Sequence, residues 1–207
     1  MAVDLSALLV PPHAALVANE CQRGVIGDHS LLPELARAAA PVVPAIARLA
    51  AAARRAGVPV VHTTAVRRAD GRGSNQNARL FMATRRSPKP MAPGTPQAEI
   101  VPEIGVAESD LVLPRMHGLS PMSGTELDPV PRNLGVRTIV AVGVSVNVAI
   151  TNLVFDAVNA GYQVVVPRDA VAGLPPSYVD AVFEHTLGLL ATVTTAAEVL
   201  GVWNNAA

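Results

Sequence analysis

The fold of this chain is decided by residues 138–161, which read TIVAVGVSVNVAITNLVFDAVNAG. Residues 138–142 form a short apolar run rich in β-branched side chains, which is typical of a strand buried on both faces of a parallel sheet. From Val146 onward the apolar residues recur at helical spacing, and Gly161 fits the residue that follows a helix. The stretch therefore predicts a strand, a tight turn at Gly143 and a helix.

This strand–turn–helix unit also predicts where a ligand would bind. In an open α/β sheet, ligands bind in the crevice at the carboxyl ends of the strands. The first turn of the following helix directs unpaired backbone N–H groups into the same crevice. Those groups would stabilise negative charge that develops on a substrate. We therefore expect the functional site at this turn.

The rest of the chain repeats the alternation of strands and helices. Further strands are expected at residues 13–18, 58–64, 110–114, 162–166 and 191–195. Helices are expected at residues 31–39, 42–56, 77–84, 178–190 and 197–203, with another one ending near residue 133. The pattern predicts a single α/β domain over residues 1–207.

Residues 66–100 form a long connection with many prolines and basic residues. A loop of this length in a compact α/β domain is usually functional or flexible. Three interpretations stay open: a solvated surface arm, a segment that packs on a partner subunit, or a lid whose arginines recognise a substrate carboxylate. The basic residues are Arg67, Arg68, Arg72, Arg79, Arg85, Arg86 and Lys89.

The composition narrows the class of partner. The formal net charge is zero, so we expect neither nucleic acid nor an anionic membrane as a partner. No stretch reaches the roughly 18 apolar residues of a membrane span, and no signal peptide is recognised. The single cysteine, Cys21, fits a reducing cytoplasm, so a cytoplasmic location is expected. The five histidines lack metal-ligand spacing, so neither a metal nor a cofactor is expected.

The apolar content has two interpretations. Half of the residues are hydrophobic and only 15% are charged. This surplus predicts apolar surface buried between subunits, and hence a homo-oligomer, either a dimer or a tetramer. Alternatively, the many alanines reflect the base composition of the genome. The sequence leaves both interpretations open.

Polar residues follow the expected strands at their carboxyl ends. Glu20 comes directly after the first strand, where a carboxylate either caps a helix, pairs with an arginine or takes part in catalysis. Further polar residues at these strand ends are candidates for binding a substrate. They are Asn19, Gln22, His62 and Asn147.

Two blocks of the chain resemble one known family. Residues 143–148, GVSVNV, and residues 156–172, DAVNAGYQVVVPRDAVA, are similar to the isochorismatase-like cysteine hydrolases. The resemblance covers essentially the whole chain. It implies a Rossmann-like three-layer α/β fold, with a six-stranded parallel sheet and helices on both faces. It also implies a cis peptide bond between Val144 and Ser145, and an oxyanion pocket formed by the N–H groups of Ser145 and Ala149.

The catalytic positions of that family are altered here. Its Asp aligns with Glu20, its Cys aligns with Ala149, and its Lys aligns with Leu113 or Arg115. Ala149 cannot act as a nucleophile. Arg115 keeps a positive charge but does not exchange protons near neutral pH, because its pKa exceeds about 12. His117 could transfer a proton there, or could simply be a surface residue.

These changes favour chemistry without a thiolate. One branch of the superfamily also lacks the Cys and hydrolyses a vinyl ether, which needs a proton donor. We therefore expect a hydrolase of a small molecule that works by general acid catalysis from Glu20, if burial raises the pKa of this carboxyl group. The alternatives are an amide hydrolase, or a catalytically silent binding or assembly protein. A further reading takes Ala149 as an introduced replacement for Cys, but the other altered positions argue against it.

Overall fold

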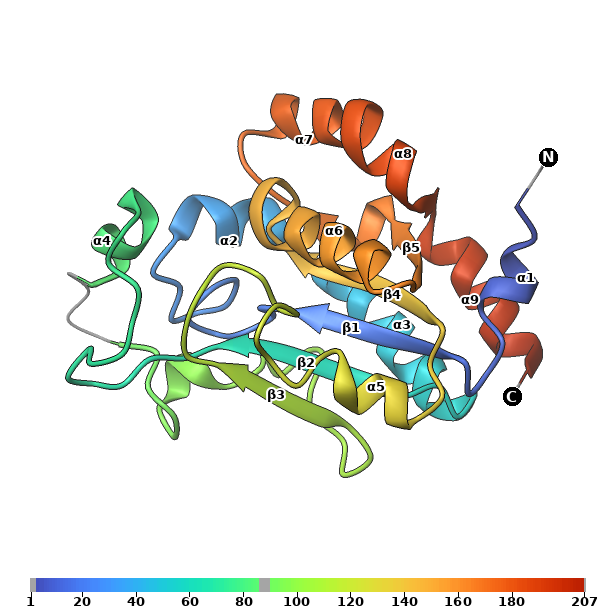
Figure 1. The fold of residues 1–207 in the computed structure, drawn as a ribbon, viewed down its shortest axis with the longest axis horizontal. Coiled ribbons are helices and arrows are strands. Elements are labelled where there is room, and N and C mark those ends of the chain that lie inside the picture. Colours follow the sequence, from blue (N-terminus) through green and yellow to red (C-terminus); the bar gives the residue numbers. More distant parts are fainter. Residues whose placement is uncertain (1–2, 86–89, 207) are drawn as a thin grey trace.

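The computed structural model describes residues 3–85 and 90–206. Its centre is a parallel β-sheet with the strand order β3-β2-β1-β4-β5-β7 (Figure 1). The strands on this path are β1 (Ala14–Asn19), β2 (Val60–Ala65), β3 (Leu111–Arg115), β4 (Thr138–Val144), β5 (Gln163–Pro167) and β7 (Thr192–Thr194). The expected α/β fold is confirmed.

The two central strands are buried along their whole length. Every residue of β1 and β4 is buried, and the strands pair in register from Ala14 opposite Thr138 to Asn19 opposite Gly143. Successive side chains of a strand point to opposite faces. Leu16 and Ala18 accordingly lie in one hydrophobic cluster, while Ala15 and Val17 lie in another. A strand with two buried faces needs apolar residues throughout, which explains the continuous runs in the sequence.

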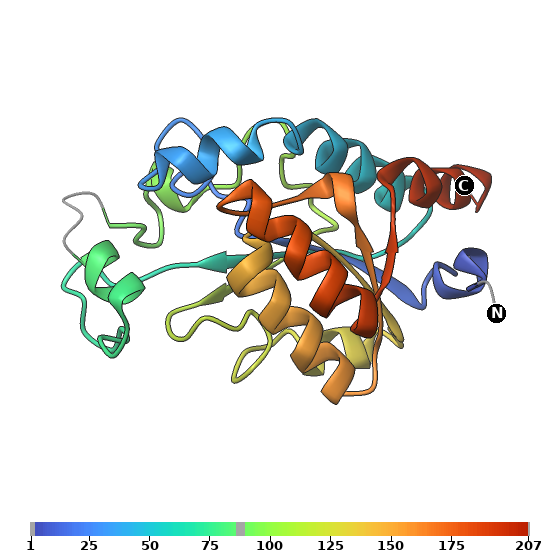
Figure 2. The same ribbon diagram turned by 90° about the horizontal axis from the view of Figure 1, so that it is seen from above.

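Helices cover both faces of the sheet (Figure 2). One face carries α3 and α9, whose apolar sides pack on the first cluster. The other face carries α6 and the α7–α8 region, packed on the second cluster. The helices are α1 (Leu5–Leu8), α2 (Pro33–Ala39), α3 (Val43–Arg55), α4 (Arg79–Arg85), α5 (Pro129–Asn133), α6 (Thr151–Asn159), α7 (Pro176–Val182), α8 (Gly188–Leu190) and α9 (Ala196–Ala206).

Two details differ from the expectation. The sheet has a seventh strand, β6 (Val171–Ala172), which pairs with β4 beside Gly143 and Val144. Two residues are too few to show a periodicity, so the pattern could not predict this strand. The helix expected over residues 178–190 is divided by the π-helical turn η4 (Phe183–Leu187) between α7 and α8.

The long connection after β2 projects beyond the carboxyl ends of the strands (Figures 1 and 2). It contains α4 and the 3₁₀ turn η1 (Pro96–Ala98). Two of its basic residues, Arg86 and Lys89, lie outside the described residues. Asn75 ties this arm to the loop after β3, because its Oδ1 accepts a hydrogen bond of 2.8 Å from the N–H of Gly118. The arm therefore lies next to the crevice where ligands were expected.

Among the described residues, no single helix is both long enough and apolar enough to cross a membrane. Only the pair α2 and α3, bent by 60°, would meet the criteria of length and composition together.

Candidate active site

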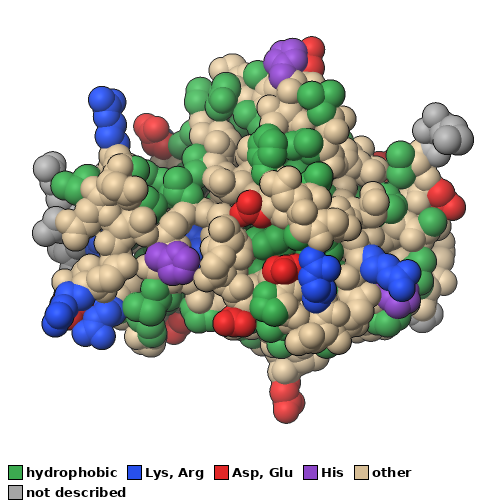
Figure 3. Space-filling view, in the orientation of Figure 1, with side chains coloured by type: hydrophobic (Ala, Val, Ile, Leu, Met, Phe, Trp, Pro, Cys, Tyr) green, Lys and Arg blue, Asp and Glu red, His purple; other side chains and the backbone are tan. Residues whose placement is uncertain are grey.

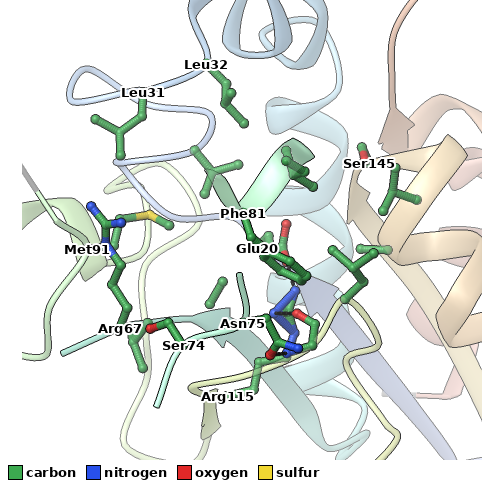
Figure 4. A pocket seen from close by; sticks show the side chains of 18 of the residues that line it. Glu20, Leu31, Leu32, Arg67, Ser74, Asn75, Phe81, Met91, Arg115 and Ser145 are labelled. Carbon is green, nitrogen blue, oxygen red and sulfur yellow. Dashed lines mark hydrogen bonds and ion pairs between the residues drawn. The ribbon is translucent and has the colours of Figure 1, made fainter. Parts of the chain in front are cut away.

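A cavity of about 610 Å³ opens at the carboxyl ends of β1, β3 and β4. Glu20, Arg115 and Ala149 line its polar part, together with Ser145 and Asn147. Figure 4 shows Glu20, Arg115 and Ser145 around the same space as Asn75 and Phe81 of the arm. The crevice expected from the strand–turn–helix pattern is therefore present.

Glu20 and Arg115 form an ion pair in this cavity. Nη2 of Arg115 donates a hydrogen bond to Oε1 of Glu20, and Nη1 donates to the carbonyl oxygen of Gly118 at 3.3 Å. Both side chains are largely shielded from solvent. Leu113 instead packs against the hydrophobic cluster under α6. Of the two positions that could replace the family's Lys, Arg115 is therefore the one that faces the acid.

The backbone at Glu20 has an uncommon conformation. Its φ angle is +51°, and among residues 3–85 and 90–206 no other residue except glycine has a positive φ. An acidic residue in this left-handed region is strained, and such strain concentrates at functional sites. The N–H of Glu20 donates to the carbonyl oxygen of Thr63 at 2.8 Å, which holds the turn. The turn brings the Glu20 side chain to the cavity.

Burial and Arg115 have opposite effects on the pKa of the Glu20 carboxyl group. Burial raises the pKa of this carboxyl group above its ordinary value, because the charged form loses its hydration. The charge of Arg115 and its hydrogen bond lower the pKa, but less than burial raises it. A carboxyl group with a raised pKa can carry a proton at a higher pH than an exposed Glu, which is what a general acid requires.

Ala149 occupies the turn opposite this acid. It lies in the π-helical turn η2 (Val146–Ile150), which precedes α6, and it is buried at the cavity wall. The peptide bond between Val144 and Ser145 is cis. Ser145 also lines the cavity, and its carbonyl oxygen accepts from the N–H groups of Val148 and Ile150 at 3.1 Å. The turn is well formed, but the side chain that it holds at position 149 is a methyl group.

Gly143 allows β4 to reach this turn. Its φ angle is +105°, and a Cβ atom there would lie 2.2 Å from the carbonyl oxygen of Asn19 in β1. No side chain fits at such a distance, so the close approach of β1 and β4 requires glycine.

The only cysteine of the chain, Cys21, lies outside the cavity. Cys21 is fully buried in the hydrophobic core and does not line the cavity. Burial, and to a smaller extent the nearby charge of Glu20, raises the pKa of its thiol to about 12. Its Sγ donates a hydrogen bond to the carbonyl oxygen of Asn19. A buried thiol of this kind is inert at neutral pH.

Three of the expected substrate-binding residues do not line the cavity. Asn19 is fully buried, donates to the carbonyl oxygen of Val144 and accepts a hydrogen bond of 2.8 Å from Thr63. Gln22 bonds both the N–H and the carbonyl oxygen of Ala65. These two side chains hold neighbouring strands and loops together, so the expectation that they contact a substrate is corrected.

His62 also lies away from the cavity. It is fully buried on the α3 side of β2, and its Nε2 lies 3.0 Å from Oδ2 of Asp110, which also pairs with Arg54. Burial lowers the pKa of this imidazole, and Asp110 opposes that effect. His62 is therefore part of a buried polar cluster rather than of the substrate site.

The remaining candidates lie at the cavity. Asn147 lines it from within the turn η2, and His117, an exposed residue on the loop after β3, lines it as well. Met122 is buried in the hydrophobic core and Met116 is exposed at the wall, so neither fills the space. Of the arm's basic residues whose side chains are described, Arg67 alone lines the cavity. Any recognition of a substrate carboxylate by those residues would therefore involve Arg67.

Sequence reasoning missed the apolar part of the wall. Figure 4 shows side chains from the segment before α2 and from the arm around the same space as Glu20. Some of these residues lie in loops, and the others lie in α2 and α4, two helices of only 7 residues each, so the pattern could not predict which way their side chains point. The residues are Val25, Leu31, Leu32, Leu35, Leu80, Phe81, Met91 and Leu119.

Metal binding has no support from the side chains that are placed. Throughout residues 3–85 and 90–206, His, Cys, Asp and Glu nowhere gather as a group of three that could hold a metal ion.

Comparison with known proteins gives related folds and sequences. A cysteine hydrolase from Pseudomonas syringae pv. phaseolicola superimposes with a TM-score of 0.83 at 23% identity, and the match covers 94% of each chain. An uncharacterised isochorismatase family protein of Bacillus subtilis, YwoC, is 38% identical over 76 residues, which is 36% of this chain and 39% of YwoC. N-carbamoylsarcosine amidase of Arthrobacter is 25% identical over 138 residues, which is 67% of this chain and 52% of the amidase.

The two curated relatives are thus matched over about half of their length or less. The family itself is identified over a longer stretch. Residues 14–198 match the Isochorismatase domain, which includes β1 with Glu20, the turn at Ala149 and β7. The resemblance seen in the sequence is confirmed, and the chain belongs to the isochorismatase family of hydrolases.

Proposed function

We propose that this protein hydrolyses a small molecule by proton transfer from Glu20, without a covalent enzyme intermediate. The observation that carries the proposal is the position of the Glu20 carboxyl group, which lines an open cavity together with a methyl group at residue 149. Family membership supports hydrolysis as the reaction class. The raised pKa of Glu20 supports the role of an acid.

A vinyl ether is the substrate class that this arrangement fits best. The Glu20 carboxyl group would protonate the enol carbon, and the resulting carboxylate would face the positive oxocarbenium ion. Water would add to that ion, and the hemiketal would break down to a carbonyl compound and an alcohol. No step needs a nucleophilic side chain. General acid catalysis of this kind contributes about 10²–10⁴-fold to the rate.

Arg115 would set the proton affinity of the acid. As an always-charged partner it cannot give or take the proton itself. Its charge and hydrogen bond lower the pKa of Glu20 and so oppose the effect of burial. It would also stabilise the carboxylate that remains after the proton has left.

Amide hydrolysis is the second candidate, and the similarity to N-carbamoylsarcosine amidase favours it. An amide is attacked readily by a thiolate, but residue 149 is alanine and Cys21 is buried with a pKa near 12. The carboxylate of Glu20 would then have to activate water as a general base. This reaction is harder than protonation of an enol ether, so we place it second.

A silent binding protein is the third candidate. It would keep the cavity and the fold, and the altered Asp, Lys and Cys positions favour it. The cavity stays open at Glu20, and Met116 and Met122 leave it unfilled. This supports a protein that still takes up a small molecule, whether or not it turns it over.

A hydrolysis screen distinguishes the three candidates. Enol ethers, esters and amides are offered to the wild type, to Glu20→Gln and to Glu126→Gln, which removes an exposed carboxylate outside the cavity. We expect hydrolysis of enol ethers that falls about 100-fold or more in Glu20→Gln and is unchanged in Glu126→Gln. Equal rates in all three proteins would eliminate Glu20 as the acid. No turnover of any class would leave the binding protein.

We further propose that the chain forms a homo-oligomer. Large apolar side chains are exposed on α6 to α8, where Figure 3 shows hydrophobic side chains gathered. They include Phe155 and Val158 on α6, Tyr178 on α7 and Leu189 on α8. Covering such a surface between subunits is favourable.

A cytoplasmic location stays a prediction from the sequence.

A further inference from the structure

Apolar side chains from two segments far apart in the sequence line the cavity beside its polar end. One segment comprises the residues before α2 and the start of that helix, and it contributes Leu31, Leu32 and Leu35. The other is the arm, which contributes Leu80 and Phe81 from α4. Figure 4 shows Leu31, Leu32 and Phe81 around the same space as Glu20.

Part of this wall is in contact with water. Leu32, Leu80 and Met116 are 37%, 41% and 44% exposed, and all three line the cavity. Single exposed apolar residues are ordinary, but a group of them around one concave space marks a binding surface. A ligand that covers them removes apolar area from water, which is favourable.

The cavity is larger than a very small substrate would fill. Its volume of about 610 Å³ lies in the range of pockets that hold drug-sized ligands, roughly 300–1,000 Å³. A molecule of a few heavy atoms that reached Glu20 would leave the leucines and Phe81 uncovered. An occupant that touches both ends has a polar group at Glu20 and Arg115 and an apolar body along the wall.

We propose that the substrate carries a bulky apolar group, aromatic or branched aliphatic, next to the bond that is hydrolysed. This inference rests on the proposed function, because it assumes that the reacting group lies at Glu20. Phe81 and Leu32 are then specificity-determining residues, one from each side of the wall. Affinity rises with the apolar size of the ligand, by about fourfold for each buried methylene group.

The test is a calorimetric titration with methyl sulfones, which offer a polar acceptor and are inert to hydrolysis. The series runs from dimethyl sulfone through butyl and hexyl methyl sulfone to phenyl and naphthyl methyl sulfone. We expect the dissociation constant to fall along the series in the wild type. A dissociation constant that does not change with ligand size overturns the proposal.

Matched variants identify the wall. Phe81→Ser and Leu32→Ser should each weaken the binding of the large sulfones by about tenfold and flatten the size dependence. Met82→Ser is the control, because Met82 is an exposed neighbour of Phe81 on α4 that does not line the cavity. Flattening in either wall variant, with Met82→Ser unchanged, supports the proposal. A size dependence that survives in both wall variants overturns it.

This titration is independent of turnover. If Glu20 proves not to be the acid, the sulfone series can still show the apolar wall. If the series is flat while Glu20→Gln loses hydrolysis, the catalytic proposal stands and the substrate class is wrong. The two failures are therefore distinguishable.

Discussion

The proposed acid is one side chain, Glu20, and two opposing effects act on the pKa of its carboxyl group. Burial raises its pKa and Arg115 lowers it, with burial having the larger effect. Only the protonated form can act as a general acid, so the rate should be high at low pH and fall as the pH rises through this pKa. The folded state also prefers the protonated form, so the stability that Glu20 contributes is lost over the same rise in pH.

Replacing Arg115 should move this pH dependence. In Arg115→Met both influences that lower the pKa of Glu20 are gone, so the alkaline limb of the kcat/KM profile should shift to higher pH. The control is Arg115→Lys, which keeps the charge and should leave the limb near its wild-type position. The measurement is kcat/KM against pH for the three proteins. A limb that stays in place in Arg115→Met would show that Glu20 does not control the rate.

A second prediction concerns the alkylation of a thiol at position 21 and of one introduced at position 149. In the wild type the thiol of Cys21 is buried and has a pKa of about 12. Iodoacetamide at pH 7 to 8 should therefore neither modify this thiol in the native protein nor reduce the hydrolytic activity. In Ala149→Cys the new thiol lines the cavity and should be alkylated once. Mass spectrometry counts the adducts. Modification of native wild-type protein would contradict the buried position of Cys21.

At the scale of the elements, β1 and β4 must approach closely for the turn at residues 145–149 to reach the cavity. A Cβ atom at Gly143 would lie 2.2 Å from the carbonyl oxygen of Asn19, at a φ angle that favours glycine. Gly143→Ala should therefore lower the free energy of unfolding by about 3 kcal/mol or more. Gly201→Ala is the control, because it lies in α9 with open space around it and should be neutral or stabilising by up to about 1 kcal/mol. Urea unfolding measures both, and equal stabilities would contradict the close approach.

The elements with a strong pattern could be predicted from the sequence, and those without one could not. The strands at the centre show continuous apolar runs because both faces are buried, and α3 shows helical spacing because one side packs on the sheet. The two-residue β6 has no such signal. It forms because β4 offers it a free edge beyond the end of its pairing with β5.

The site could be predicted only in part for a related reason. The sequence places polar residues at the end of β1, but it does not say which of them turns to the cavity. The left-handed backbone of Glu20 turns that side chain to the cavity, while Asn19 and Gln22 hydrogen-bond inside the protein. The leucines and Phe81 of the wall lie in the short helices α2 and α4 or in loops, and the path of these segments depends on tertiary contacts such as the hydrogen bond between Asn75 and Gly118.

At the scale of the whole molecule, the helical layer formed by α6 to α8 leaves apolar side chains uncovered on its outer side. Leu189 is 80% exposed and Phe155 is 45% exposed, on neighbouring α8 and α6. If this surface is a subunit interface, the wild type should behave as a dimer or tetramer in light scattering, and Leu189→Asp should shift it to the monomer. Leu80→Asp, an exposed leucine on the arm, should not change the mass. A monomeric wild type would contradict the proposed oligomer.

The same molecule combines a fold shared with a cysteine hydrolase and a cavity that no cysteine side chain lines. The reaction should therefore depend on the transfer of a proton from Glu20 to the substrate, and isotopic labelling can follow that proton. The most direct measurement is the hydrolysis of a vinyl ether in D₂O. We predict a slower rate than in H₂O, a single deuterium on the former enol carbon of the product, and loss of this reaction in Glu20→Gln. A product without deuterium at that carbon, or an unchanged rate in Glu20→Gln, would contradict the account.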